Sequence, residues 1–136
     1  MSGERRKARG LALQALYEID CAGHSPVGVM SNLLGEGVLS PDNTAFGRRL
    51  VTGVMENLQR IDEQITSFAP AWPISQMALV DRGILRIAIY EMVIEGSSPV
   101  GVVINEAVEL AKAFGGESSP RFINGVLSSV SHLTSH

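Results

Sequence analysis

The stretch SQMALVDRGILRIAIYEMVIE, residues 75–95, is apolar on almost every side of the helix that its spacing predicts. A helix that is apolar all round must be covered on all sides, and in a globular protein this places it in the middle of a helical bundle. Its apolar positions are Met77, Leu79, Val80, Ile84, Leu85, Ile87, Ala88, Ile89, Met92 and Val93. Residues 75–95 therefore predict an all-α fold with this segment near its centre.

Toward the N-terminus, apolar side chains at three- and four-residue spacing predict a helix over about residues 6–20. Its buried stripe would consist of Ala8, Leu11, Ala12, Ala15, Leu16 and Ile19. A second, partly apolar line is formed by Gly10, Leu13 and Tyr17. We therefore expect this helix to be covered on two sides or to keep one face for a partner.

Two serine-proline pairs predict the next helix starts, because serine is a favoured helix cap and proline fits the first helical position. The pairs are Ser25-Pro26 and Ser40-Pro41. The helices that follow them should cover about residues 26–34 and 41–68. The second is either one long helix or two helices with a break near residues 57–61.

The C-terminal part of the chain predicts two more helices. A turn at residues 96–99 precedes a helix that runs to Phe114, and Gly115 is expected to cap it in the left-handed conformation. Ser118-Ser119-Pro120 then begins the last helix. The sum is an all-α bundle of about seven helices.

Composition places this bundle in one domain, residues 1–136. A chain of 136 residues with 45% apolar and 18% charged side chains suits a single packed core. No apolar run approaches the ~20 residues that span a bilayer, and no signal peptide is recognisable, so we expect a cytoplasmic protein. The single cysteine, Cys21, excludes an internal disulfide and is expected to be a small core residue.

Sequence motifs for catalysis are absent. The chain has no dinucleotide-binding, phosphate-loop, zinc-protease or serine-hydrolase motif. Its three histidines are His24, His132 and His136, and no carboxylates surround them at metal-ligand spacing. We therefore expect no enzymatic activity, no metal and no cofactor.

Positive charge is concentrated at the N-terminus. The chain has 11 basic and 14 acidic residues, and four of the basic ones lie within residues 1–10. They are Arg5, Arg6, Lys7 and Arg9. A local basic segment on an acidic protein suits a focused nucleic-acid contact, since Lys and Arg neutralise phosphates. The alternative is a solvated helix start.

Arg86 is embedded in the apolar segment LVDRGILRIAIYE. A buried or half-buried arginine needs an anionic partner. The sequence leaves two interpretations open, a structural ion pair with a carboxylate and a contact with a phosphate.

Four segments together resemble the NusB family of bacterial transcription antitermination factors. They are RRKARGLALQALYEID, FGRRLVTGV, VDRGILRIAIYE and PVGVVINEAVELAKAFGGESSPRFINGVL. The similarity covers nearly the whole chain. It implies a compact, all-helical, non-catalytic RNA-binding protein that pairs with NusE, the small-subunit ribosomal protein S-ten. The pair would hold the single-stranded boxA element of nascent RNA and, with NusA and NusG, keep RNA polymerase elongating, notably on ribosomal RNA operons.

The resemblance also implies roles for individual residues. The expected RNA-binding residues are Arg5, Arg6, Lys7 and Arg9, with Arg86, Arg121, Phe122 and Asn124 as further candidates. Asp81 matches an acidic position that is expected to face NusE. Val100 and Ser118 depart from the family pattern on that partner surface, where many relatives have an aromatic and an acidic residue.

Two other functions are compatible with such a fold. One family of RNA cytosine methyltransferases carries a NusB-like N-terminal domain, so the chain could be part of such an enzyme. A homodimeric helical scaffold is the other alternative, in which the line of Gly10, Leu13 and Tyr17 could form the contact.

Overall fold

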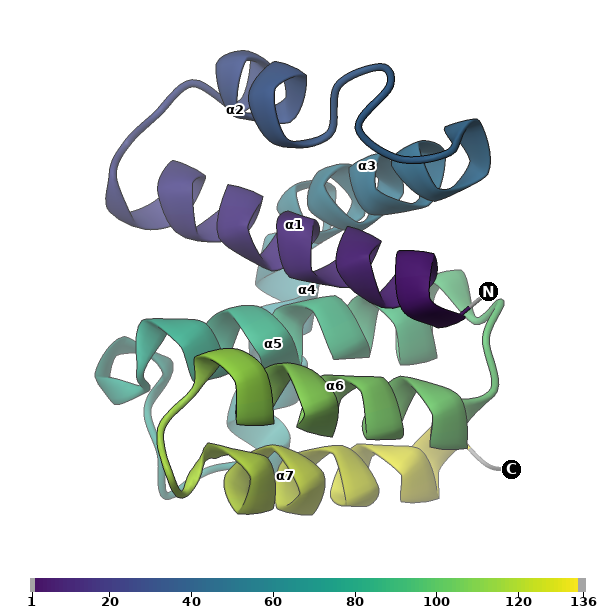
Figure 1. The fold of residues 1–136 in the computed structure, drawn as a ribbon. Coiled ribbons are helices and arrows are strands. Elements are labelled where there is room, and N and C mark those ends of the chain that lie inside the picture. Colours follow the sequence, from purple (N-terminus) through teal and green to yellow (C-terminus); the bar gives the residue numbers. More distant parts are fainter. Residues whose placement is uncertain (1, 135–136) are drawn as a thin grey trace. The chain divides into compact units, whose positions relative to one another are not determined.

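The computed structural model describes residues 2–134, so His136 lies outside the described residues. Within them the chain forms seven α-helices and no strand, which confirms the predicted all-α fold of about seven helices (Figure 1). The chain divides into two compact units, residues 1–55 and 56–136. The single domain expected from composition stays a prediction.

The N-terminal unit contains α1 (Ser2–Cys21), α2 (Pro26–Leu33) and α3 (Pro41–Glu56). Most of the predicted stripe on α1 is buried, namely Ala8, Ala12, Ala15 and Leu16. From the second line, Leu13 is buried as well, whereas Tyr17 is 48% exposed. Cys21 ends the helix at the surface, so its prediction as a core residue was wrong.

The two serine-proline pairs behave differently. Both helices begin at the proline, as predicted. At α3 the Ser40 hydroxyl accepts hydrogen bonds from the Asn43 amide N–H, 3.4 Å, and from the Asn43 side-chain nitrogen, 3.0 Å. The Ser25 side chain makes no capping hydrogen bond, so the start of α2 depends on the fixed backbone of Pro26 instead.

The C-terminal unit contains four α-helices and two short helical segments. They are α4 (Leu58–Phe68), η1 (Ile74–Gln76), α5 (Leu79–Ile89), η2 (Tyr90–Glu95), α6 (Val100–Phe114) and α7 (Ser119–Thr134). Helix α5 packs against α4, α6 and α7, and Ile84, Leu85 and Ile89 are fully buried. Within this unit, the segment that is apolar all round therefore contacts helices on several sides, as its sequence predicts.

The central segment is not one regular helix over residues 75–95. Its first residues form the 3₁₀ turn η1, and its last six, Tyr90–Glu95, form the π-helix η2. The Gly96 N–H donates to the Glu91 carbonyl at 2.9 Å, which closes the widened final turn, and Gly96 has a φ of +66°. Only glycine adopts this left-handed conformation without steric cost, so Gly96 fixes where the helix ends.

Two helix ends answer questions that the sequence left open. Asn57 separates α3 from α4, so residues 41–68 form two helices rather than one. Gly115 caps α6 with φ −93° and ψ −174°, so the predicted left-handed cap was wrong. A Cβ atom on Gly115 would lie 2.6 Å from the Ser119 Cβ, so close packing against the start of α7 is what requires glycine here.

Candidate functional site

Three guanidinium groups gather on one aromatic ring of the N-terminal unit. The guanidinium carbons of Arg5, Arg9 and Arg49 lie 4.1, 5.1 and 5.8 Å from the centre of the Phe46 ring. Cations at these distances are attracted to the negative face of an aromatic ring. We call these four residues the Phe46 arginine cluster.

Helix periodicity explains how the cluster forms. Arg5 and Arg9 are four residues apart on α1 and so share a face, and Arg49 follows Phe46 by three residues on α3. Arg9 is only 4% exposed, whereas Arg5 is half-buried and Arg49 exposed. Arg9, expected among the RNA-binding residues, is thus buried on α1, where Phe46 of α3 lies against it.

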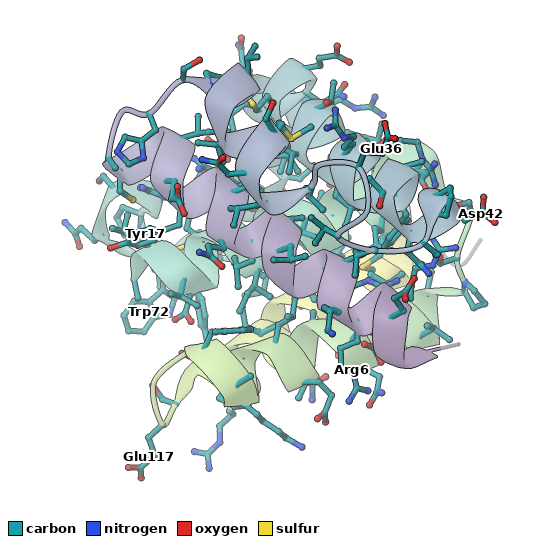
Figure 2. The ribbon with its side chains drawn as sticks, turned by 45° about the horizontal axis from the view of Figure 1, so that its top comes forward. Arg6, Tyr17, Glu36, Asp42, Trp72 and Glu117 are labelled. Atoms are coloured by element: carbon teal, nitrogen blue, oxygen red, sulfur yellow. The ribbon has the colours of Figure 1, made fainter. Side chains whose placement is uncertain are left out.

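The other two basic residues of α1 are exposed at the surface. They are Arg6 and Lys7, and Figure 2 shows Arg6 and Tyr17 toward opposite ends of α1. Helix α1 begins at Ser2, earlier than the sequence predicts. Three of its four basic residues, Arg6, Lys7 and Arg9, therefore lie beyond the first turn of the helix. The unfavourable interaction of cations with the helix dipole is confined to that turn and is therefore small.

Glu4, the acidic residue among these cations, is engaged with α3. One of its carboxylate oxygens accepts hydrogen bonds from the Ser40 backbone N–H, 2.9 Å, and the Asn43 side-chain nitrogen, 2.8 Å. Hydrogen bonds from Ser40 and Asn43, helped by the charge of Lys7, lower the pKa of Glu4 to about 2. Glu4 therefore stays ionised and links the starts of α1 and α3.

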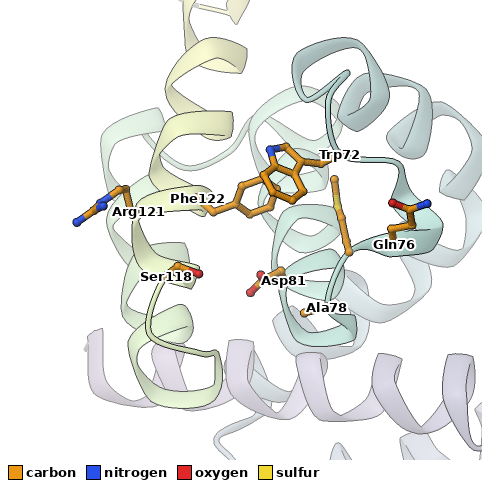
Figure 3. Close-up of a pocket in the computed structure, with 8 residues that line it drawn as sticks. Trp72, Gln76, Ala78, Asp81, Ser118, Arg121 and Phe122 are labelled. Carbon is orange, nitrogen blue, oxygen red and sulfur yellow. The ribbon is translucent and has the colours of Figure 1, made fainter.

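A pocket of about 370 Å³ opens in the C-terminal unit (Figure 3). Its lining includes Trp72, Met77, Asp81, Ser118, Arg121 and Phe122. We call it the Trp72 pocket. It brings together two residues expected to bind RNA, Arg121 and Phe122, and two expected on the partner surface, Asp81 and Ser118.

The Trp72 pocket combines aromatic surface with an unsatisfied acceptor. The Trp72 and Phe122 rings meet edge to face, with centroids 5.9 Å apart and planes at 74°. Trp72 is nevertheless 58% exposed. The Oδ1 atom of Asp81 is buried and has no hydrogen-bond partner in the part of the chain that the structure describes. The pocket therefore combines exposed aromatic surface with one acidic and one basic side chain, Asp81 and Arg121.

Arg86 is held inside the C-terminal unit by a carboxylate. Its Nε and Nη2 atoms donate to the two oxygens of Asp62, both at 2.9 Å. The Arg86 side chain is 11% exposed and that of Asp62 26%. Of the two interpretations that the sequence left open, the structure shows the ion pair, and we do not retain Arg86 as an RNA-binding candidate.

The remaining candidates lie apart from the pocket lining. Asn124 is exposed on α7, three residues after Arg121, and its side-chain oxygen accepts a hydrogen bond of 3.4 Å from the Ser128 hydroxyl. Val100 is the first residue of α6 and is half-buried. The structure therefore unites Asp81 with Ser118 but does not bring Val100 to the same pocket.

Sequence reasoning missed three residues that build these sites. Phe46 reads as one more apolar residue in a helical pattern, and Asp62 as part of a polar helix face. Trp72 carried a signal, because a large aromatic residue between Pro70 and Pro73 lies in a loop, where it is easily exposed. Nothing in the sequence shows that Trp72 meets Phe122, which lies 50 residues further along the chain.

No group of three or more His, Cys, Asp or Glu side chains among residues 2–134 is arranged to hold a metal ion. No helix in that range is both long enough and apolar enough to span a membrane.

The sequence comparisons agree on one family. The model of the NusB family matches residues 6–132. The transcription antitermination protein NusB of Dehalococcoides mccartyi strain CBDB1 is 53% identical over 131 residues, which cover 96% of this chain and 92% of that protein.

Solved structures agree with the sequence matches. NusB of T. maritima superposes with a TM-score of 0.86 at 31% identity, covering 94% of this chain and 90% of that one. A chain from a crystal structure of the antitermination factors NusB and NusE in complex with double-stranded RNA gives a TM-score of 0.87 at 27% identity, covering 98% and 99%. The family match over residues 6–132 and the 53% identity to a curated relative establish that this chain belongs to the NusB family.

Proposed function

We propose that this protein is a non-catalytic transcription antitermination factor that binds single-stranded boxA-type RNA together with NusE. Its curated relatives are named transcription antitermination proteins, and a similar chain was solved with NusE and RNA. In this proposal the assembly acts in the cytoplasm with NusA, NusG and RNA polymerase and favours elongation, notably on ribosomal RNA operons.

The observation that carries the proposal is the arrangement of cations on α1. Arg6 and Lys7 are exposed, and the Phe46 arginine cluster holds Arg5 beside them. Exposed Arg and Lys side chains neutralise the phosphates of an RNA backbone, and this favours binding through release of counterions. A guanidinium also forms paired hydrogen bonds with phosphate oxygens, which makes an RNA backbone a suitable ligand.

Binding titrations test this proposal. Fluorescence anisotropy would be measured with a boxA oligonucleotide, a scrambled oligonucleotide of the same composition, and a duplex of the boxA strand, each with and without NusE. We expect weak binding by the protein alone and tight binding to single-stranded boxA with NusE, because two proteins then contribute surface to one ligand. Equal affinity for boxA and scrambled RNA in the presence of NusE would contradict the sequence-specific function.

The two alternatives predict other results. A homodimeric scaffold would show a dimer mass in light scattering at the concentrations used for the titrations, and added RNA would leave it unchanged. A methyltransferase domain would methylate RNA when supplied with S-adenosylmethionine. Our proposal predicts RNA binding without any such transfer.

A further inference from the structure

A small hydrogen-bond network joins the first turn of α1 to the start of α3. Its members are Glu4, Ser40 and Asn43, and we call these three residues the Glu4 clasp. We propose that the Glu4 clasp positions the cations of α1 for RNA by keeping the start of this helix folded before RNA binds. The inference rests on the proposed RNA-binding function and assigns a positioning role to an acidic residue.

One carboxylate oxygen is the centre of the clasp. The Oε1 atom of Glu4 accepts hydrogen bonds from the Ser40 backbone N–H, 2.9 Å, and from the Asn43 side-chain nitrogen, 2.8 Å. The same nitrogen donates to the Ser40 hydroxyl oxygen at 3.0 Å, and this oxygen also accepts from the Asn43 backbone N–H at 3.4 Å. Bonds to a carboxylate are stronger than bonds to a neutral acceptor. The two donors are therefore held in place before they meet Glu4.

The α3 side of the clasp is fixed to the core of the N-terminal unit. Asn43 precedes Phe46 by three residues on α3, and Phe46 is only 2% exposed. The Phe46 ring is a second attachment point, since the guanidinium carbon of Arg5 lies 4.1 Å from its centre. Two positions of α3, about one helical turn apart, therefore hold the consecutive residues Glu4 and Arg5 of α1.

The start of α1 needs such attachment because helix ends and chain ends unfold most easily. The first four N–H groups of a helix have no partner within it. Helix α1 begins at Ser2, so the exposed cations Arg6 and Lys7 lie close to this end. If the segment folded only on contact with RNA, each residue ordered at that moment would lower the affinity roughly five- to thirtyfold. The clasp avoids this loss.

Replacement of Glu4 separates positioning from simple electrostatics. A carboxylate near RNA repels phosphates, so charge alone predicts that Glu4→Ala and Glu4→Gln both bind RNA more tightly. We expect Glu4→Ala instead to bind boxA RNA about fivefold more weakly in the presence of NusE, because the acceptor of the clasp is lost while the Arg5 contact remains. Glu4→Gln keeps an acceptor oxygen without the charge and should restore binding at least to the wild-type level.

Asp42→Ala is the matched control. Asp42 is an exposed acidic residue in the first turn of α3, beside Asn43 in the sequence. Its replacement removes one negative charge and leaves the acceptor oxygen of Glu4 in place. We expect this variant to bind RNA no more weakly than wild type, with circular dichroism confirming that all variants are folded.

Two further readouts assign the effect to the clasp. All cations remain in Glu4→Ala, so the slope of log affinity against log salt should equal that of wild type, although the affinity is lower. Asn43→Ala removes a donor of the clasp and should also weaken RNA binding. Because both residues belong to one network, the double variant should lose less than the sum of the two single losses.

Hydrogen exchange tests the clasp in the absence of RNA. In full-length Glu4→Ala we expect the backbone amides of residues 5–9 to exchange faster than in wild type, while those of residues 46–54 keep their rates. Glu4→Gln should keep wild-type rates in both segments. Faster exchange in both segments of Glu4→Ala would show that Glu4 supports the whole unit and would overturn the positioning role.

The binding data can overturn the inference in two other ways. If Glu4→Ala binds RNA as tightly as wild type, or if Glu4→Ala and Glu4→Gln are weakened equally, RNA binding stands and the positioning role is wrong. If wild type binds no RNA even in the presence of NusE, the proposed function fails and this inference fails with it, whatever the exchange rates show.

Discussion

In the N-terminal unit, Arg5, Arg9 and Arg49 converge on the ring of Phe46, whereas in the C-terminal unit Arg86 lies against the carboxylate of Asp62. The first arrangement places three guanidinium groups on one aromatic ring, next to the exposed side chains of Arg6 and Lys7. The second cancels a charge inside the packed helices. A cluster of cations gives affinity that depends on salt and not on sequence, because phosphates are the same at every position of RNA.

The Trp72 pocket of the C-terminal unit has the opposite character. It holds one acidic and one basic side chain beside two aromatic rings, so it adds little net attraction to a polyanion. Contacts with a base can distinguish one base from another. We therefore expect binding strength to come from residues 1–55 and base preference from residues 56–136. The following variants test that division, from the largest expected effect to the smallest.

Removal of the accessible cations of α1 should have the largest effect. We expect Arg5→Ala/Arg6→Ala/Lys7→Ala to weaken RNA binding about a hundredfold at low salt and to reduce the slope of log affinity against log salt by about 2, near 0.7 per lost phosphate contact. Base preference should not change. Arg9 stays in place because it is buried, and its removal would destabilise the fold.

A control for that variant removes two exposed cations of the C-terminal unit. Arg60→Ala/Lys112→Ala changes two exposed residues, on α4 and α6, and should leave affinity within about threefold of wild type, as few phosphate contacts would be lost. An equal loss of affinity in this control would show that total charge, rather than the α1 cluster, governs binding.

Breaking the Arg86 and Asp62 pair should affect stability rather than binding. Because both side chains are only partly exposed, we expect Arg86→Ala to lower the free energy of unfolding by about 2 kcal/mol, less than a fully buried pair would lose. Urea denaturation measures this change, and the double variant with Asp62→Ala should lose less than the sum of the two single variants. A clear loss of RNA affinity by folded Arg86→Ala would restore Arg86 as a binding residue.

Phe46 should act on binding through the arginines that it holds. We expect Phe46→Leu to weaken RNA binding about threefold, since it removes the cation–π attraction while keeping an apolar side chain. Ile65→Val is a control for destabilisation of the core, since Ile65 is fully buried in the C-terminal unit. If both variants bind RNA equally, Phe46 contributes only to the core.

Substitution of Glu4 by glutamine should have the smallest effect of these variants. It should appear as a pH dependence of the stability difference between wild type and variant. Its pKa is lowered from an ordinary value of 4.5 to about 2, so its contribution to stability is complete above pH 4.5 and is lost as the pH falls toward 2. Glu4→Gln cannot ionise, so the difference in urea midpoint between wild type and variant should shrink over that interval. A constant difference would mean that the carboxylate charge is not involved.

Local patterns in the sequence predicted most of the helices. The serine-proline pairs located the starts of α2 and α3, and the apolar segment at residues 75–95 identified the central helix of its unit. These signals lie within a few residues of one another, so periodicity and turn chemistry suffice to read them. The π-helical end at Tyr90–Glu95 was missed because it differs from an α-helix only in hydrogen-bond spacing.

The family and the basic start of α1 were likewise evident from the sequence alone. Tertiary structure decided which cations are accessible and what their partners are. Arg9 is buried because Phe46 packs over it from α3, and Arg86 is neutralised because α4 presents Asp62 to α5. The Trp72 pocket likewise needs side chains that are far apart in the chain. Periodicity assigns a residue to a face of its own helix, but only packing determines what that face meets.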